Sequence, residues 1–379
     1  MNLTLSEEQQ MLKKAARDFL TDKCPKEAIK RMEESEKGYS VELWQEMAEL
    51  GWMGLVFPEK YGGGGMSFLD LSLLLEEMGR VCLPGPFFSS VVLGALPISD
   101  IGTEEQKQEY LPKIASGEAI FALALNEANT RYDAASITAK ASPANGDYVI
   151  NGTKMFVPDA HIADYLLCVA RTREQAEPED GITIFLVDAK SPGISHNILK
   201  TIASDKLCEV VFNQVRTPKS NILGQLDRGW KGVQKIVQRA AVAKCCEMIG
   251  NTQRVLEMTI DYAKERKQFG RPIGSFQIIQ HYCADMATDV DGAKFSTYQA
   301  AWMLSEGLLC TKEVAIAKAW VGEASQRVIA LAHQIHGAIG VTREHDLQLY
   351  TRRAKAAELT FGDANFYREI LAKEMGLVG

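Results

Sequence analysis

The stretch from Asp261 to Ala287, DYAKERKQFGRPIGSFQIIQHYCADMA, constrains the fold more than any other part of the chain. Helical patterns stand on both sides of a short segment that contains Arg, Gly and Pro, so the stretch predicts two helices joined by a bend. An ordinary amphipathic pair of helices would produce the same pattern. The surrounding sequence must therefore show which kind of fold these two helices belong to.

The residue pattern changes twice along the chain. Residues 1 to about 120 have helical spacing, and Ser6-Glu7-Glu8 is typical of a helix start. From about residue 121 to residue 228, short apolar or alternating runs are separated by Pro and Gly, as in strands. Long helical patterns return from Trp230 onward. The 379 residues suit two or three lobes, so this order predicts an α+β protein with segments 1–120 (helical), 121–228 (β) and 229–379 (helical).

Several individual elements follow from local patterns. Further helices are predicted at Val41–Leu50, Phe68–Val81 and Thr103–Ala115, and strands at Tyr165–Ala170, Ile182–Val187 and Glu209–Phe212. The Asn151-Gly152 pair predicts a hairpin turn. The four glycines after Tyr61 lack the strand, Lys and Ser/Thr context of a phosphate-binding loop, so we interpret them as a turn between helices.

Composition narrows the class of protein. A hydrophobic content of 46% and a charged content of 24% are typical of a globular chain, and the net charge of −7 argues against a nucleic-acid partner. No apolar run approaches the ~18 residues of a membrane helix, and the N-terminus lacks the features of a signal peptide. The eight cysteines form no CxxC pair and do not combine with the six histidines at metal-ligand spacing. We expect reduced thiols, no metal and a cytoplasmic location.

Three segments resemble the acyl-CoA dehydrogenase family. Residues 261–287 match, without a gap, the family's signature Y-A-x-x-R-x-x-F-G-x-x-I-x-x-F-Q-x-x-x-x-x-x-A-D-M. Asn151–Arg171 is similar to its N-G-x-K-x-W-I-T-N-x-x-x-A-D segment, and Gln334–Gly337 to its Q-x-x-G-G flavin motif. LPGPFFSS, AHQIHGAIG and EHDL resemble a branch with steroid side-chain and dicarboxyl-CoA dehydrogenase subunits, some of them α2β2 tetramers. The resemblance implies an N-terminal helical domain, a middle β-barrel-like domain and a C-terminal four-helix bundle.

FAD is the cofactor that this resemblance implies. In the family, the residues that correspond to Arg266 and Gln277 contact the pyrophosphate of FAD in a neighbouring subunit, and Phe269 lies in the same segment. Asn126 stands where a Thr hydroxyl usually faces the flavin. Phe156 is placed to stack on the ring system, whereas Pro158 replaces a Thr and offers neither a hydroxyl nor an N–H. The flavin motif adds Gln334, His336 and Gly337.

The catalytic base of the family is missing from both of its known positions. The segment R-D-A-K-x-x-x-I-Y-E-G-T usually carries the base, and here Phe361 occupies the position of the Glu. Some relatives place the Glu on the first helix of the bundle, where this chain has Ala240. An Arg that helps to hold CoA in many relatives corresponds to Ala241. The backbone N–H at position 361 does not depend on the side chain, so Phe361 retains the donor that polarises the thioester carbonyl in the family.

Two carboxylates are candidates for a replacement base. Glu247 lies seven residues after Ala240 on the same helix face, about 10.5 Å along the axis, so it would serve only an acyl group whose reacting carbon sits at another depth. A buried or surface structural Glu is the alternative. Asp363 is the second candidate and would alternatively cap the last helix. We expect Glu358 to point away, and His281, His333 and His345 to be packing residues.

The resemblance implies an FAD-dependent oxidoreductase that acts on an acyl-CoA thioester, with a cyclic or branched acyl group and a non-standard base. Its electrons would pass to an electron-transfer flavoprotein, and the assembly would be a homotetramer or a heterotetramer with a related subunit. A non-catalytic or half-site subunit that completes FAD binding for a partner is the alternative. A reductase that runs the chemistry backwards is also compatible with the sequence.

Overall fold

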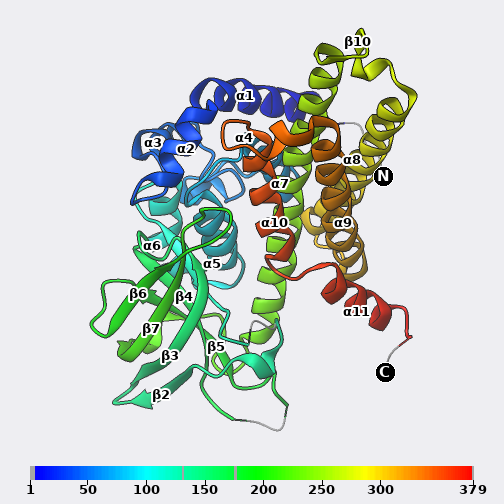
Figure 1. The fold of residues 1–379 in the computed structure, drawn as a ribbon. Helices are drawn as coiled ribbons and strands as arrows, with labels where there is room; N and C mark the ends of the chain where they lie inside the picture. The colour runs from blue at the N-terminus through cyan, green and yellow to red at the C-terminus, as the bar shows by residue number, and fades with distance from the viewer. Residues whose placement is uncertain (1–4, 130–131, 175–176, 378–379) are drawn as a thin grey trace. The chain divides into compact units, whose positions relative to one another are not determined.

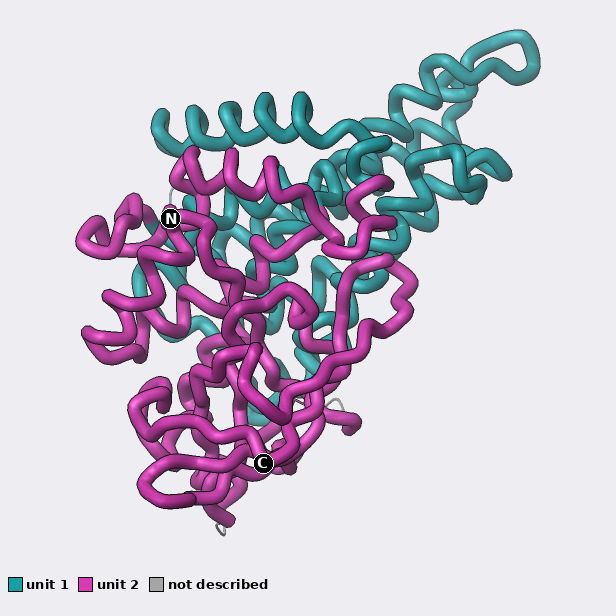
Figure 2. The backbone as a smooth tube through the Cα atoms, turned by 90° about the vertical axis from the view of Figure 1, so that its left-hand side faces the viewer, with its two compact units in different colours: residues 1–30, 67–83, 241–379 teal, residues 31–66, 84–240 magenta. Residues whose placement is uncertain are grey.

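A computed structural model describes residues 5–129, 132–174 and 177–377 of the chain. The chain divides into two compact units, each assembled from separate segments (Figure 2). Unit 1 contains Met1–Lys30, Ser67–Leu83 and Ala241–Gly379, and unit 2 contains Arg31–Met66 and Pro84–Ala240. The predicted order of helical, β and helical segments is confirmed, and the protein is α+β (Figure 1). The boundaries at residues 120 and 228 stay a prediction.

Unit 1 is built from long helices. Their bounds are α1 Glu7–Lys23, α4 Phe68–Val81, α8 Gln277–Ser305, α9 Thr311–His336, α10 Leu347–Leu359 and α11 Ala364–Glu374, together with α7 Trp230–Glu265 from Ala241 onward and the first part of α2 Lys26–Glu34. Ser6 and Ser67 begin α1 and α4 with capping boxes, in which the serine hydroxyl accepts a backbone N–H bond. The strands β9 Lys267–Gln268 and β10 Arg271–Pro272 form the bend between α7 and α8, as the opening stretch predicts.

Helices α4 and α7 cross at very short distance because both carry glycine at the crossing. A Cβ at Gly79 would lie 2.0 Å from the backbone oxygen of Glu247, and a Cβ at Gly250 would lie 1.8 Å from that of Glu76. Around the crossing, side chains of α4, α7, α8 and α9 form one apolar cluster that includes Leu73, Cys245, Met248, Ile249, Ala293 and Val321. The two glycines therefore set how closely these helices pack.

A buried polar network joins α1, α4 and α8 beside this cluster. Arg17 donates two hydrogen bonds to Glu77, at 2.9 and 2.7 Å, and Lys13 pairs with Glu76 at 2.6 Å. The hydroxyl of Tyr298 also donates to Glu76. Glu76 and Glu77 are almost fully buried, so each depends on these partners.

Unit 2 combines short helices with one mixed sheet. The helical elements are the rest of α2, α3 Val41–Glu49, a π-helix at Phe88–Ala95, α5 Leu96–Ile101, α6 Glu104–Ala115 and the first part of α7. The strands are β1 Phe121–Ala124, β2 Lys140–Ala144, β3 Asp147–Pro158, β4 Tyr165–Arg171, β5 Ile182–Asp188, β6 Ile194–Leu199, β7 Leu207–Thr217 and β8 Ile222–Leu223. They are ordered β6-β7-β3-β2-β4-β5-β8, with β1 parallel to β4.

The predicted hairpin turn at Asn151-Gly152 is wrong. Both residues lie inside β3, where the register to β7 shifts between Ile150 and Gly152. The turn is formed by the neighbouring pair Asn145-Gly146, which joins β2 to β3 with φ values of 52° and 90°. The second pair serves another purpose, since a Cβ at Gly152 would lie 2.6 Å from that of Ala139. An Asn-Gly pair thus marks either a turn or a close approach inside a strand.

Other local predictions agree with the structure. The three predicted helices correspond to α3, α4 and α6, and the predicted strands to β4, β5 and part of β7. The glycines after Tyr61 form a tight turn in which a Cβ at Gly63 would lie 2.2 Å from the backbone oxygen of Phe57. The π-helix at Phe88–Ala95 was not predicted, because a widened turn leaves no distinct spacing in a wholly apolar run.

We expect Gly250→Ala to lower the free energy of unfolding by about 1–3 kcal/mol, because its methyl group would press against the backbone of α4. Gly322→Ala is the matched control. It lies inside α9, and its Cβ would meet only the Cγ of Glu358, at 3.6 Å. This control should be neutral or stabilising by up to about 1 kcal/mol, since alanine favours helix. Denaturant unfolding of both variants measures the difference, and equal midpoints would contradict a tight crossing.

Candidate functional site

The turn between α10 and α11 carries Phe361 in a strained conformation. Phe361 has a φ of 59° and is 7% exposed, and Gly362 follows with a φ of 100°. A bulky residue in the left-handed region costs on the order of 1–3 kcal/mol and persists only where its surroundings hold it. The surrounding residues of unit 1 therefore maintain this turn. The side chain of Phe361 has no ionisable group.

Lys318 of α9 donates hydrogen bonds to the backbone at this turn. Its ammonium group, 1% exposed, donates to three backbone carbonyls at 2.7, 2.8 and 3.3 Å, those of Glu358, Gly362 and Ala357. The hydroxyl of Tyr367 donates to the carbonyl of Phe361 at 2.9 Å. Burial lowers the pKa of Lys318 to about 8, because the charged form loses its hydration. The backbone of the turn is thus held by partners on α9 and α11.

The two carboxylates nearest to Phe361 in sequence are already engaged. Asp363 accepts a hydrogen bond from the backbone N–H of Phe366 at 2.9 Å and is the N-cap of α11. Glu358 is buried, and its carboxylate binds Gln326 at 2.5 Å and Lys355 at 3.0 Å. Both groups therefore stabilise local structure in this turn.

Helix α7 carries the other family position for the base and the candidate Glu247. Ala240 and Ala241 are fully buried, and their methyl side chains have no group that can take up or release a proton. Glu247 pairs with Lys244, one helical turn earlier, at 2.7 Å. Its side chain is 24% exposed and that of Lys244 is 18% exposed. The carboxylate of Glu247 is thus partly exposed, whereas that of Glu358 is buried.

In unit 2, the structure brings Asn126 and Phe156 together. The backbone N–H of Met155 donates to the carbonyl of Asn126 at 2.8 Å. The next residue, Phe156, lies in an irregularity of β3 between Lys154 and Val157, with a φ of 55° and 42% of its surface exposed. A β-bulge of this kind turns one side chain away from the sheet. The phenyl ring of Phe156 is consequently presented outward.

The amide of Asn126 has spare hydrogen-bonding capacity. Its Nδ2 donates to the hydroxyl of Tyr132 at 3.3 Å, whereas its Oδ1 is buried and has no partner among the described residues. A buried acceptor without a partner is costly and calls for an explanation. Thr130 and Arg131, which follow Asn126 closely in the chain, lie outside the described residues. Pro158 closes β3 opposite Leu207 and has no N–H to donate.

In unit 1, the bend between α7 and α8 exposes three of the predicted contact residues. Arg266 follows the last residue of α7, Gln277 is the first residue of α8, and both are exposed. Phe269 is 92% exposed and lies edge-on to the ring of Phe276, at 6.1 Å between ring centroids. A guanidinium, an amide and an aromatic ring therefore project from one short segment.

The predicted flavin motif is divided between exposed and buried residues. Gln334 and Gly337 are exposed, and Gly337 ends α9 with a φ of 63°. His336 is 4% exposed, since its ring stacks on Tyr262 at 4.5 Å and meets the ring of His345 at 4.9 Å. Burial lowers the pKa of His336, and the neighbouring histidines lower it further. The neutral ring of His336 thus serves packing, while Gln334 and Gly337 face outward.

These residues fit FAD. An outward phenyl ring and an unpaired amide oxygen suit a ring system that carries N–H groups, and an exposed Arg and Gln suit a pyrophosphate. Pro158 is the one departure, because it removes a donor on the ring side.

Within the described residues, no group of three or more His, Cys, Asp and Glu side chains could hold a metal ion, and no helix has the length and apolar character needed to cross a membrane. The eight cysteines are free, and all but Cys283 are buried.

Sequence reasoning missed two buried lysines, Lys318 in unit 1 and Lys154 in unit 2, that hydrogen-bond the backbone near predicted site residues. Both stand at positions where the element's pattern requires an apolar side chain. Lys318 lies among Ala317, Ala319 and Val321 in α9, and Lys154 occupies a buried position of the alternating strand β3. A lysine on the buried face of an element is the signal that could have identified them, since lysine is almost never fully buried without partners.

We expect Lys318→Met to destabilise the protein, because three backbone carbonyls would lose their donor. The loss should grow with pH. The folded pKa of Lys318, about 8, lies below the ordinary value of 10.5, so the unfolded chain binds more protons between these values. Lys318 therefore contributes stability that is complete above pH 10.5 and is lost as pH falls through 8. The difference in unfolding free energy between the wild type and the variant, measured from pH 7 to 10.5, should increase, and a constant difference would contradict the lowered pKa.

Three family models match the chain. The acyl-CoA dehydrogenase N-terminal domain matches residues 6–118, the middle domain residues 122–215 and the C-terminal domain residues 227–376. A relative described as probable acyl-CoA dehydrogenase YngJ of Bacillus subtilis (strain 168) is 33% identical over 99% of this chain and 100% of its own length.

Solved structures agree with these matches. The glutaryl-coenzyme A dehydrogenase–glutaryl-CoA complex has a TM-score of 0.94 and 31% identity, and the match covers 100% of this chain and 98% of that one. The ChsE4–ChsE5 complex from Mycobacterium tuberculosis has a TM-score of 0.91 and 27% identity over 100% of both chains. These comparisons agree with the fold. They also agree with the exposed ring of Phe156 and with the bend that carries Arg266 and Gln277. The chain belongs to the acyl-CoA dehydrogenase family of FAD-dependent oxidoreductases.

Proposed function

We propose that this protein oxidises a CoA thioester with a cyclic or branched acyl group and that its base is Glu247. The observation that carries the proposal is the distribution of carboxylates. Neither Phe361 nor Ala240 offers an acid, and Asp363 and Glu358 are held by the backbone N–H or side chains around them. Glu247 is the remaining candidate: its carboxylate is partly exposed and pairs with a lysine of the same helix, and it does not cap a helix.

The ion pair of Glu247 is compatible with a role in proton transfer. Its partner Lys244 lies on the same helix and is itself partly exposed, so the pair can separate without unfolding of the turn around it. The backbone of Glu247, by contrast, lies against Gly79 and is fixed in depth along α7. A base in this place would serve a substrate whose reacting carbon lies deeper or shallower than a straight acyl chain would place it.

The remaining chemistry would be divided among other residues of the chain. The peptide N–H of Phe361, in its held turn, would donate to the thioester carbonyl and make the Cα proton more acidic. FAD supplies a hydride acceptor when it is bound. Phe156 and Asn126 would orient the ring system, and Arg266 and Gln277 would hold the pyrophosphate of a neighbouring subunit's FAD. An electron-transfer flavoprotein would accept the electrons.

A half-site subunit is the second candidate function. The observation that favours it is that both family positions for the base carry no acid, while the segments that contact FAD retain exposed Phe156, Arg266 and Gln277. One of the similar solved structures is a complex of ChsE4 with ChsE5. In this form the protein would complete FAD sites within a heterotetramer, and a related partner subunit would supply the base.

Anaerobic mixing with a panel of acyl-CoAs, followed by flavin absorbance, tests the function. Under the main proposal, cyclic or branched acyl-CoAs bleach the flavin, and Glu247→Gln lowers that rate by about 10²–10⁴-fold, the usual contribution of a general base. Glu109 of α6, which pairs with Lys113 one helical turn later and has no assigned role, gives the matched control Glu109→Gln, and it should leave the rate within a few-fold. Unchanged bleaching in Glu247→Gln would exclude it as the base. Bleaching only after addition of a related subunit would support the half-site function.

Phe361→Glu should confer activity on straight-chain acyl-CoAs, which we expect the wild type to oxidise poorly. The new carboxylate would stand beside the backbone N–H that holds the thioester carbonyl, and burial would raise its pKa towards the working pH. Loss of the ring leaves a partial cavity, so recovery should be incomplete. Glu247→Gln should not affect this new activity. Rapid turnover of butyryl-CoA by the wild type would show that the base has been misplaced.

A further inference from the structure

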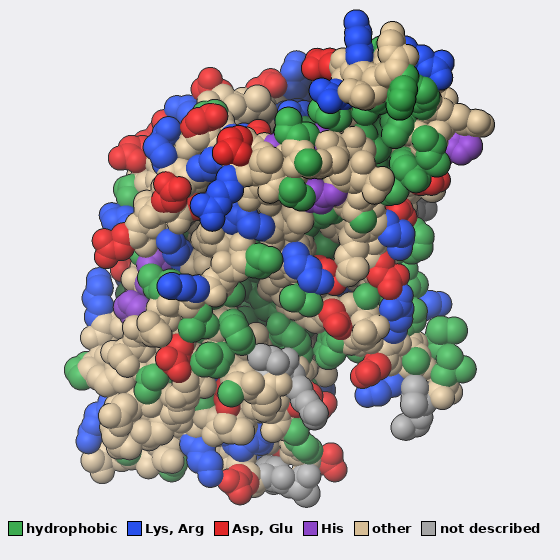
Figure 3. All heavy atoms as spheres, viewed as in Figure 1, with side chains coloured by type: hydrophobic (Ala, Val, Ile, Leu, Met, Phe, Trp, Pro, Cys, Tyr) green, Lys and Arg blue, Asp and Glu red, His purple; other side chains and the backbone are tan. Residues whose placement is uncertain are grey.

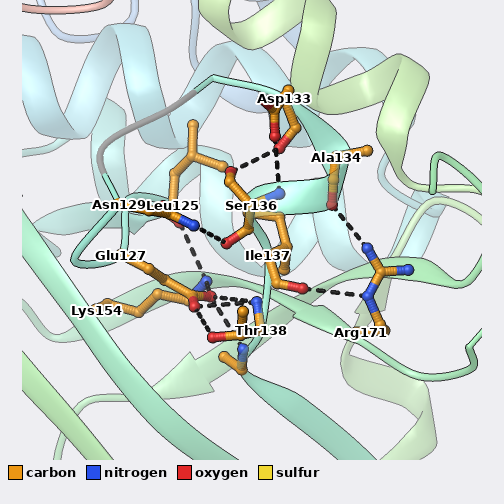
Figure 4. Close-up of polar contacts among 11 residues, drawn as sticks. Leu125, Glu127, Asn129, Asp133, Ala134, Ser136, Ile137, Thr138, Lys154 and Arg171 are labelled. Carbon is orange, nitrogen blue, oxygen red and sulfur yellow. Dashed lines mark hydrogen bonds and ion pairs between the residues drawn. The ribbon is translucent and has the colours of Figure 1, made fainter.

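Unit 2 contains a buried ion pair between Lys154 of β3 and Glu127, which follows Asn126 in the chain (Figure 4). Lys154 is 0% exposed and Glu127 is 6% exposed, and Nζ and Oε1 are 2.7 Å apart. Nζ also donates to the carbonyl of Leu125 at 3.1 Å. A charge pair this deep in a sheet costs hydration on both sides, so its persistence calls for complete pairing.

The carboxylate of Glu127 is fully engaged. It accepts the backbone N–H of Thr138 at 3.0 Å and that of Ala139 at 3.0 Å, and it also accepts the hydroxyl of Thr138. Burial by itself would raise the pKa of Glu127, but the charge and hydrogen bond of Lys154 and the other donors outweigh it and lower the pKa. Glu127 therefore ties both ends of the loop 127–138 to one lysine of β3.

The residues on either side of this pair are those expected to touch the flavin. Lys154 donates to the carbonyl of Leu125, and Met155 donates to the carbonyl of Asn126, so two successive residues of β3 hold the two residues that precede the loop. Phe156 is the next residue of β3 and has the outward, positive-φ conformation. Lys154 is thus two residues from the ring of Phe156 and is bonded on both sides of Asn126.

A second side chain holds the far end of the same loop. Arg171 of β4 donates to the carbonyls of Ala134 and Ile137, at 2.7 and 3.1 Å, and the carboxylate of Asp133 caps the short turn between them by accepting the backbone N–H of Ser136 at 2.8 Å (Figure 4). With the end at Ala134–Ile137 fixed in this way, the position of Asn126 depends on the Lys154–Glu127 pair at the other end.

We propose that Lys154 and Glu127 are positioning residues for the flavin, which fix Asn126 and the bulged Phe156 against one another and so set the polarity and geometry of the ring contact. Neither side chain touches the cofactor in this assignment. They act through the backbone of Asn126 and through the bulge at Phe156. The inference rests on the FAD site of unit 2 and not on which acyl-CoA is oxidised.

Four variants test the pair in the full-length FAD protein: Lys154→Met, Glu127→Gln, the double variant, and Lys140→Met as matched control. Lys140 lies in β2 of the same sheet and pairs with Glu174 at 3.0 Å, but both side chains are largely exposed. The readouts are the FAD dissociation constant, the visible circular dichroism of the flavin, and its reduction potential. Far-UV circular dichroism reports whether each variant is folded.

We expect Lys154→Met to weaken FAD binding by at least 10-fold and to change the flavin circular dichroism and potential, because Glu127 would be left without its counter-charge. Glu127→Gln retains an acceptor for Thr138 and Ala139, so its change should be in the same direction and smaller. The double variant, which removes both charges, should recover part of the loss seen in Lys154→Met. Lys140→Met should match the wild type in every readout.

The proposal would be overturned if both single variants fold and hold FAD with wild-type affinity, spectrum and potential. It would also be overturned if Lys154→Met fails to fold while Glu127→Gln leaves the flavin unchanged, since the pair would then serve stability alone. None of the readouts uses a substrate. Absence of acyl-CoA turnover in the wild type would therefore count against the proposed reaction and leave the assignment of the pair intact.

Discussion

The close crossing of α4 and α7 is the constraint on which most of unit 1 depends. Because Gly79 and Gly250 let the two backbones touch, Leu73, Cys245 and Met248 can share one apolar cluster with α8 and α9. α9 in turn brings Lys318 under the turn that contains Phe361. The same crossing fixes the depth of Glu247, whose backbone oxygen lies against Gly79. Helix packing and the placement of the candidate base thus follow from two residues that lack a side chain.

Several buried charged side chains of this protein are held in partnered sets. Glu76 and Glu77 are paired with Lys13 and Arg17, and Lys154 with Glu127. On the surface, acidic and basic side chains both occur over the face in view, in keeping with a net charge of only −7 (Figure 3). Buried sets of this kind tolerate the loss of both partners better than the loss of one. They therefore specify local geometry more than they add stability.

The sequence predicted the order of the elements and the bounds of α3, α4 and α6 closely, because spacing and caps are local properties. It predicted Asp363 as a possible helix cap for the same reason. It could not distinguish Asn145-Gly146 from Asn151-Gly152, since only the neighbouring strands decide which pair turns. Nor did it reveal that Lys154 and Lys318 are buried, because their partners, which are backbone carbonyls and the carboxylate of Glu127, are distant in sequence.

The left-handed turn at Phe361 also restricts which residues evolution can place there. A positive φ disfavours side chains that branch at Cβ, so valine, isoleucine and threonine are poor choices, whereas residues with a plain Cβ methylene are tolerated. Phenylalanine and glutamate both belong to the tolerated group. A single position can therefore gain or lose an acid while the backbone around it, held by Lys318 and Tyr367, stays the same. Chemistry and architecture are separable at this residue, and a lineage can change the first without rebuilding the second.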